Sequence, residues 1–181
     1  MNQTILNILP LKTERLILRI TTLNDVNLIL KMDKQKQTQK FLGGIKNKTK
    51  EERMIFLKNK IDKSKEGNIY PITIELKERL PIGFIDLKID PQTKIGQISY
   101  IFDSDYWKKG YCLEACQKLI ELSFTKLKLT KILASTLKEN TNSKRLLEKL
   151  GFKLKESRTK LSSIDKIEQY NCFLEYELIK K

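Results

Sequence analysis

The chain has 181 residues, of which 40% are hydrophobic and 32% are charged, and its formal net charge at pH 7 is +14. This length predicts a single domain spanning residues 1–181 with a core at 11–178, and no segment approaches the roughly 20 apolar residues of a membrane-spanning helix. Histidine is absent, which excludes Ser-His-Asp and Cys-His nucleophile systems and histidine-containing metal sites.

Three cysteines, Cys112, Cys116 and Cys172, make an odd number, and the chain start lacks the basic head and cleavage site of a signal peptide. We therefore expect a cytoplasmic protein. Cys112 and Cys116 lie four residues apart on a predicted helix, where small apolar packing is favoured over a redox or metal role. A zinc site would need more ligands, so we expect no metal site.

The positive charge is spread along the chain. Only six of the 36 basic residues are arginine, and the lysines form no single block. A nucleic-acid-binding domain usually clusters its charge and interleaves aromatic residues. The pattern therefore favours a lysine-rich surface, and an acidic partner is the alternative.

In the first third of the chain, a strand is predicted at 15–20 and a helix after Thr22. The polar segment 33–48, which contains Gly43-Gly44, is predicted to be a loop. Thr49 to Glu52 fits the capping-box pattern, so a second helix is expected to begin there.

The remaining elements begin with an antiparallel meander of three strands separated by turn sequences, at 69–76, 82–89 and 95–102. A helix at 110–127, a strand at 131–137, a helix from Asn140 or Thr141 to Gly151, and strands at 152–157 and 169–178 follow. The order βααβββαβαββ predicts a mixed α+β fold, in which helices cover the faces of one sheet.

Two segments that lead into helices contain the residues expected to bind a cofactor. Residues 106–110, Tyr-Trp-Lys-Lys-Gly, connect a strand to a helix, whose first N–H groups and dipole can hold phosphate. Residues 140–143, Asn-Thr-Asn-Ser, place amide and hydroxyl groups at the mouth of the next helix. Together they indicate a phosphorylated cofactor with a long polar arm, against the plainer alternative of a solvated loop.

Five fragments in order resemble the GNAT superfamily of N-acetyltransferases, and within it the RimJ/RimL-like branch, over nearly the whole chain. The fragments are 11–19, 81–85, 96–102, 106–115, and 140–143 with 148–152. The resemblance implies the acyl-CoA N-acyltransferase fold, with a central, mostly antiparallel, splayed seven-stranded sheet flanked by four helices. It also implies direct transfer of acetyl from acetyl-CoA to a primary amine in a ternary complex.

The superfamily's pyrophosphate loop has the form Arg/Gln-x-x-Gly-x-Gly/Ala, and the matching positions here are 107–112. Gly110 matches the pattern, Lys108 takes a position that is commonly glycine, and Cys112 replaces the final small residue. By resemblance, the cofactor's phosphates are bound by Lys108, Lys109, Gly110, Tyr111 and Cys112.

The resemblance also assigns contacts to the pantetheine arm. The main chain of Ile101, Phe102 and Asp103 lies nearest the cofactor, and Asn140 hydrogen-bonds the arm, although a simple N-cap is the alternative. Ser143 matches a position near the thioester sulfur and is the catalytic candidate, although a local cap partner is the plainer interpretation.

The sequence identifies neither the general base nor the amine that accepts the acetyl group. Glu75 and Asp103 are base candidates, each against a plain surface or turn role. We rank a protein or peptide N-terminus above a small amine, and segments 33–48 and 158–170 are expected to set this choice. Because 33–48 is basic, a cationic aminoglycoside is disfavoured. A non-catalytic acetyl-CoA-binding protein and a basic nucleic-acid-binding domain are the alternatives, and a homodimer is compatible with the resemblance.

Overall fold

The computed structural model describes residues 5–41, 48–67, 69–164 and 167–180. Within them, one sheet has the strand order β1-β2-β3-β4-β5-β6-β8-β7, and only β5 and β6 are parallel. The strands are β1 Leu11–Lys12, β2 Leu16–Ile20, β3 Ile69–Leu76, β4 Pro81–Asp90, β5 Ile95–Phe102, β6 Lys131–Leu137, β7 Lys153–Ile164 and β8 Ile167–Ile179. The α-helices are α1 Val26–Asp33, α2 Lys36–Gln39, α3 Lys50–Lys65, α4 Tyr111–Thr125 and α5 Thr141–Lys149.

The expected mixed α+β fold is confirmed, with small differences in the elements. The sheet has eight strands rather than seven, because the two residues of β1 pair with β2. The segment expected to be a loop holds the short helix α2, and Gly43-Gly44 lie outside the described residues. The last two strands are longer than expected, because β7 and β8 pair along one long hairpin.

Two helix ends follow their sequence signals. The Thr49 hydroxyl accepts a hydrogen bond from the Glu52 N–H (3.2 Å), and the Glu52 carboxylate accepts one from the Thr49 N–H (2.8 Å), so the predicted capping box is confirmed. Gly151 follows α5 with a φ of +85°. The Phe152 N–H then donates to the Leu147 carbonyl at 3.0 Å, the closure that glycine permits after a helix.

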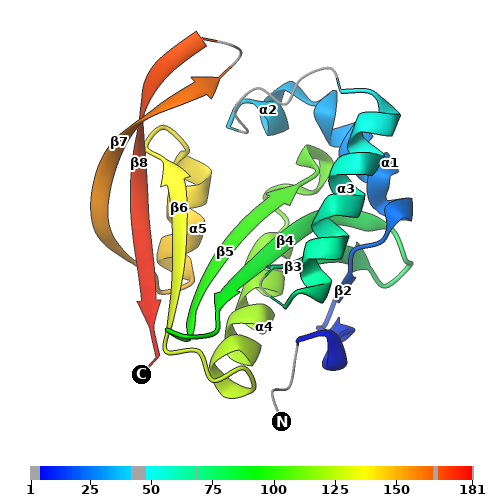
Figure 1. The fold of residues 1–181 in the computed structure, drawn as a ribbon, viewed down its shortest axis with the longest axis horizontal. Coiled ribbons are helices and arrows are strands. Elements are labelled where there is room, and N and C mark those ends of the chain that lie inside the picture. The colour runs from blue at the N-terminus through cyan, green and yellow to red at the C-terminus, as the bar shows by residue number, and fades with distance from the viewer. Residues whose placement is uncertain (1–4, 42–47, 68, 165–166, 181) are drawn as a thin grey trace.

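The sheet separates two apolar clusters, because neighbouring residues on a strand face opposite sides. On β4, Ile85 and Leu87 belong to the large cluster that includes the buried side chains of α4. Phe84 faces the other way and packs on Leu28 and Met32 of α1. Figure 1 shows α1 and α3 on one face of the sheet and α4 on the other.

The strands β5 and β6 diverge after a short common stretch. Both lie wholly within the described residues, and they pair with each other only at 95–97 and 131–133. Beyond that, β5 stays paired with β4 as far as Phe102, and β6 stays paired with β8 as far as Leu137. In Figure 1 the two strands meet at the bottom and separate towards the top. The splayed sheet that the resemblance implies is therefore present.

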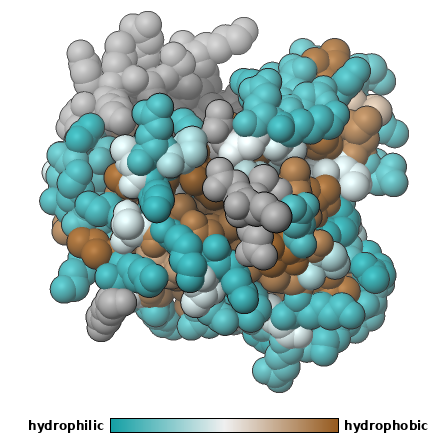
Figure 2. All heavy atoms as spheres, turned by 60° about the horizontal axis from the view of Figure 1, so that its bottom comes forward, coloured by the Kyte–Doolittle hydropathy of each residue, from teal (hydrophilic) through white to brown (hydrophobic). Residues whose placement is uncertain are grey.

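The surface is largely polar. On the face drawn in Figure 2, hydrophilic residues prevail and hydrophobic residues gather towards the middle, as the 32% of charged residues leads one to expect. Among the described residues, no helix has both the length and the apolar character that crossing a membrane requires.

Candidate active site

The wall of the opening between β5 and β6 is main chain of β5. The Asp103 N–H donates to the Ile82 carbonyl of β4 at 3.0 Å. Because main-chain groups alternate sides along a strand, Tyr100 and Phe102 direct theirs towards β6. The Trp107 indole N–H donates to the Phe102 carbonyl at 2.8 Å and thereby ties the following loop to the end of the strand.

Of the three residues expected along the pantetheine arm, Phe102 turns its main chain into the opening. Ile101 and Asp103 turn theirs towards β4 by the same alternation. The Asp103 carboxylate is buried and binds the Lys31 ammonium (2.5 Å) and the Gln35 amide (2.6 Å). Asp103 therefore fixes α1 and the segment after it to the end of β5.

The loop at the end of β5 turns through two left-handed residues. Lys108 has a φ of +61°, and Gly110, the residue before α4, has a φ of +83°. The common glycine of the phosphate pattern is thus replaced by a lysine that takes up a glycine-like conformation. Lys109 and Tyr111 flank Gly110, so the first N–H groups of α4 and two lysines lie at one place, a donor set that fits a diphosphate.

Arg15 fixes this loop and the start of α4 through side-chain contacts. Its guanidinium donates to the Lys109 carbonyl (3.0 Å) and to the Glu114 carboxylate (2.7 Å), and it lies 4.6 Å from the centroid of the Tyr111 ring. Thr13 adds a 2.5 Å hydrogen bond to Glu114. These contacts fix the start of α4, and they were not found from the sequence because about a hundred residues separate the partners. The Thr-Glu-Arg triplet at 13–15 was the available signal.

The opposite side of the opening carries Ser143. The Asn140 side-chain oxygen accepts a hydrogen bond from the Ser143 N–H (3.1 Å) and caps α5. The Tyr100 and Ser143 hydroxyls lie 2.8 Å apart, which links β5 to the helix that follows β6. Burial raises the pKa of Tyr100, so its phenol is protonated at neutral pH. Burial and the Cys116 thiol likewise raise the pKa of Cys112, so this thiol is protonated at neutral pH.

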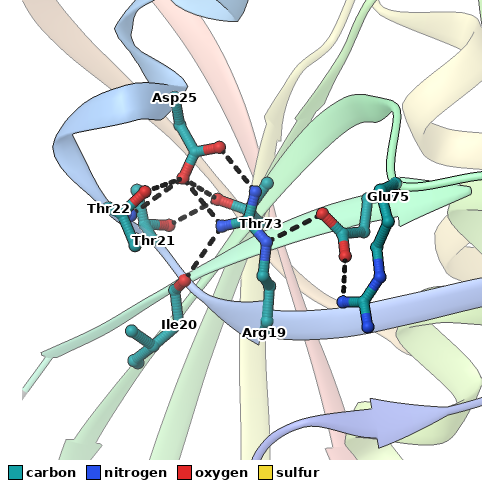
Figure 3. Close-up of polar contacts among 8 residues, drawn as sticks. Arg19, Ile20, Thr21, Thr22, Asp25, Thr73 and Glu75 are labelled. Atoms are coloured by element: carbon teal, nitrogen blue, oxygen red, sulfur yellow. Dashed lines mark hydrogen bonds and ion pairs between the residues drawn. The ribbon is translucent and has the colours of Figure 1, made fainter.

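The two candidate bases are held in ion pairs. Glu75 accepts from Arg19 (2.8 Å) and Arg79 (3.0 Å). Figure 3 shows how Arg19 lies between Glu75 and Asp25 and binds both carboxylates, while Thr73 donates to Asp25. Because Glu75 and Asp103 are both committed to buried anchoring contacts, neither offers a free carboxylate to an amine.

The comparisons with known proteins agree on the family. A model described as "Acetyltransferase (GNAT) domain" matches residues 15–153. The chain is 30% identical over 145 residues to the uncharacterized N-acetyltransferase p20 of Bacillus licheniformis, covering 78% of this chain and 81% of the relative.

The chain belongs to the GNAT acetyltransferase family. It is accordingly an acyltransferase that uses acetyl-CoA. Its fold also matches solved structures. One is a GNAT-family acetyltransferase from Bacillus anthracis (TM-score 0.78, 23% identity, 93% and 96% of the two chains covered). Another is RimL, a ribosomal L7/L12 α-N-protein acetyltransferase (TM-score 0.83, 16% identity, 94% and 93% covered).

Two adjoining cavities lie between the sheet and α3. We call the first the inner pocket, about 230 Å³, lined largely by apolar side chains such as Ile29, Met32, Phe56, Phe84 and Ile101. We call the second the outer groove, about 450 Å³ and more open, with Lys60, Lys63 and Lys88 in its wall. Phe84 and Ile101 face away from α4, so the inner pocket lies across the sheet from the loop that precedes α4.

Replacing Lys108 with glycine is expected to weaken acetyl-CoA binding without destabilising the fold. Glycine adopts a positive φ without the roughly 1–2 kcal/mol that a side chain adds, whereas the loss of the ammonium group removes a charge from the phosphate site. We expect a Kd about three- to fivefold higher by calorimetry, the size of one partly exposed charge contact. Lys128, with a φ of +58°, gives the matched control: Lys128→Gly should leave the Kd unchanged. An equal Kd for both variants would contradict the role of Lys108.

Stability is expected to fall in acid because of the buried carboxylates. Burial opposes ionisation of Asp103, but hydrogen bonds from Gln35 and Lys31 outweigh it and lower the pKa of this group. The same balance, with Arg19 and Thr22 as donors, lowers the pKa of Asp25. The stabilisation is therefore present above the unfolded-state pKa of about 3.9 and disappears as the pH falls through the lower folded-state pKa. The urea concentration at the midpoint of unfolding should be constant from pH 7 to pH 5 and should decrease when the pH falls below about 4. The decrease should be less steep in the variant Asp103→Asn.

Proposed function

We propose that this acetyltransferase is a RimJ/RimL-like enzyme that transfers acetyl directly to a primary amine in a ternary complex. The N-terminus of a protein or peptide is ranked above a small amine. The observation that carries the proposal is the opening between β5 and β6, which has a loop with two lysines and a left-handed glycine at the end of one strand and a cavity across the sheet. The similarity to RimL supports the branch at the level of fold, and a spermidine N-acetyltransferase from Vibrio cholerae is similar too (TM-score 0.79, 18% identity).

The residues at the opening fit acetyl-CoA, which when bound supplies an activated thioester. The first N–H groups of α4, from Tyr111 and Cys112, together with Gly110 and the two lysines before it, are assigned to the diphosphate. The Phe102 main chain and the Asn140 amide are assigned to the pantetheine arm. Ile101 and Asp103 are assigned a positioning role, because they fix the strand whose Phe102 main chain faces the cofactor.

The chain's own groups then have defined tasks. Main-chain N–H groups of β5 that face the opening stabilise charge on the carbonyl oxygen, a role usually worth about 3 kcal/mol. The Ser143 hydroxyl donates to the departing sulfur, and the protonated Tyr100 hydroxyl, 2.8 Å away, positions it. Because a thiol has a pKa near 8.5, this step needs only modest acid assistance. Holding two reactants on either side of one sheet supplies much of the rate.

Ser143→Ala tests this assignment. We expect kcat to fall about tenfold, less than the roughly 100- to 10,000-fold that is typical of general acid–base catalysis, because the leaving group is weakly basic. The Kd for acetyl-CoA should stay within about twofold. Steady-state kinetics and calorimetry measure the two quantities. Ser135→Ala, an exposed serine on β6, is the control. A variant at Ser143 with wild-type kcat would remove this residue from the mechanism.

The proposed reaction is tested by CoA-thiol release with peptides of different N-termini, polyamines and aminoglycosides. Acetyl-CoA binding without amine-dependent release would show a non-catalytic binder and would contradict the proposal. Strong, salt-sensitive binding of DNA or RNA that competes poorly with CoA would favour the nucleic-acid alternative. Homodimer formation stays a prediction, which light scattering can check.

A further inference from the structure

Two buried oxygen atoms in the inner pocket point to a hydrogen-bond donor in the ligand. Within the described part of the chain, Gln39 Oε1 and Asp86 Oδ1 are the buried side-chain atoms with no hydrogen-bond partner, and both residues line this pocket. The other polar atoms of these side chains are used: the Gln39 amide donates to Met32 and Asp33, and Asp86 Oδ2 binds Lys60 at 2.5 Å. An unsatisfied buried oxygen costs roughly 1–3 kcal/mol, so a ligand that supplies N–H groups is favoured.

The charges of the inner pocket limit that ligand to one ammonium group. Its ionised side chains form two pairs, Asp33 with Arg53 and Asp86 with Lys60, so the walls carry no net charge. The remaining lining is largely apolar. A second cationic group would lose its hydration without gaining a carboxylate, which is strongly unfavourable. The pocket therefore suits a single amine attached to an apolar side chain.

The pocket lies next to the opening between β5 and β6. Asp86 is directly opposite Ser99 in the β4–β5 register. Ile101 lines the pocket and immediately precedes Phe102, whose main chain faces the opening. An amine held at Asp86 is thus on the acceptor side of the same strand that borders the proposed thioester site.

The outer groove continues this pocket and is positively charged. The two cavities share Phe56, Lys60, Asp86 and Ser99 in their walls. The groove adds Lys63 and Lys88 to the shared residues. The carboxylate in its wall is that of Asp86, which is already paired with Lys60. A ligand that leaves the inner pocket along the groove therefore meets two further lysines, and a carboxylate is the complementary group.

We propose, on the basis of the function proposed above, that the acceptor is a peptide with an apolar first residue and an acidic residue close behind it. The α-amino group donates to Gln39 Oε1 and Asp86 Oδ1, and the acidic side chain lies near Lys63 and Lys88. Acetyl transfer forms the amide C–N bond and breaks the thioester C–S bond, while the amine gives up one proton and CoA leaves as the thiol. An α-amine, with a pKa of about 8, is neutral far more often than a lysine amine.

Matched peptides test the outer groove. Peptides that begin with the same apolar residue and carry Glu, Gln or Lys at the second and third positions are compared by kcat/KM in the CoA-release assay. We expect the Glu peptide to exceed the Gln peptide by about fivefold, and the Gln peptide to exceed the Lys peptide by a similar factor, the size of partly exposed charge pairs. Lys63→Glu/Lys88→Glu should invert the order. Lys58→Glu/Lys77→Glu, the same change in charge at exposed positions outside the groove, should preserve it.

The inner pocket is tested with the neutral Gln peptide. Asp86→Asn should raise the KM for peptide at least about tenfold, the value of a hydrogen bond to a charged group, and leave the Kd for acetyl-CoA unchanged. Lys60→Met removes the partner of Asp86 without altering Oδ1 and leaves the carboxylate without its cation, so its KM for this peptide should not rise. An equal rise in both variants would assign the effect to the ion pair and overturn the role of Oδ1.

The proposed function and this inference fail in different ways. If no amine of any kind releases CoA while acetyl-CoA still binds, the transfer reaction itself is wrong and the inference falls with it. If spermine or the Lys peptide is acetylated at least as efficiently as the Glu peptide, the reaction stands and the acidic-peptide acceptor is overturned.

Discussion

Gly110→Val is expected to raise the Kd for acetyl-CoA at least about 100-fold, corresponding to roughly 2.7 kcal/mol. Gly110 has a φ of +83°, and an added Cβ would lie 3.3 Å from the Arg15 guanidinium. A β-branched residue is a genuine outlier at such a φ, so the loop would relax towards negative φ. The first N–H groups of α4 would then turn away from the place where a diphosphate binds. Calorimetric titration of acetyl-CoA measures the change.

Gly67→Val provides the control for backbone strain alone. Gly67 has nearly the same φ, +84°, at the end of α3, and its added Cβ meets nothing closer than 3.7 Å. Both variants should lose about 1–2 kcal/mol of unfolding free energy, but only Gly110→Val should lose affinity. If the two variants bind acetyl-CoA equally well, the diphosphate does not lie at the start of α4.

Arg19→Met is expected to destabilise the protein by about 3–5 kcal/mol, the range for removing one partner of a buried ion pair. Arg19 donates to Asp25 (2.7 Å) and to Glu75 (2.8 Å), and both carboxylates are nearly inaccessible to solvent. Without the guanidinium, the buried charge of Asp25 would be left with the Thr22 and Thr73 donors, and Glu75 would be left with Arg79. At about 2–4 °C per kcal/mol for a chain of this size, the thermal midpoint should drop by roughly 6–20 °C.

Lys118→Met is the matched control, since it removes an ion pair from the surface of α4. Lys118 and Glu121 lie 3.0 Å apart, and Glu121 is 61% exposed, so the loss should stay below about 0.5 kcal/mol. Chemical denaturation at pH 7 measures both variants. A loss below about 1 kcal/mol for Arg19→Met would show that Asp25 and Glu75 find other partners, contrary to the buried-pair argument.

Most of the elements were readable from the sequence because their signals are local. The capping box at Thr49, the glycine stop at Gly151 and the three-strand meander each depend on residues within one turn or one hairpin. The boundaries were less accurate where pairing decided them. β1 forms only because it meets β2, and the long hairpin of β7 and β8 is set by cross-strand pairing rather than by a strong local pattern.

For the site, the sequence placed Gly110, Asn140 and Ser143 at helix starts, where the structure has them. It could not show that Arg15 holds the loop before α4 or that the Tyr100 hydroxyl contacts Ser143, since these contacts join residues 43 or more apart. Nor could it separate a free carboxylate from a buried anchor. Glu75 and Asp103 were open either as bases or as surface or turn carboxylates, and only the structure shows their arginine, lysine and glutamine partners.

The amino-acid order by itself thus determined the fold class and the order of the elements, because helix caps, turns and hydrophobic periodicity act over a few residues. The family followed from the resemblance of five fragments to known sequences. Only the tertiary structure decided which carboxylates are already paired, where β5 leaves β6, and that two unsatisfied oxygens share a pocket with apolar walls. These features depend on burial and on distances between remote segments. Both quantities arise when the sheet assembles, and no single stretch of sequence contains them.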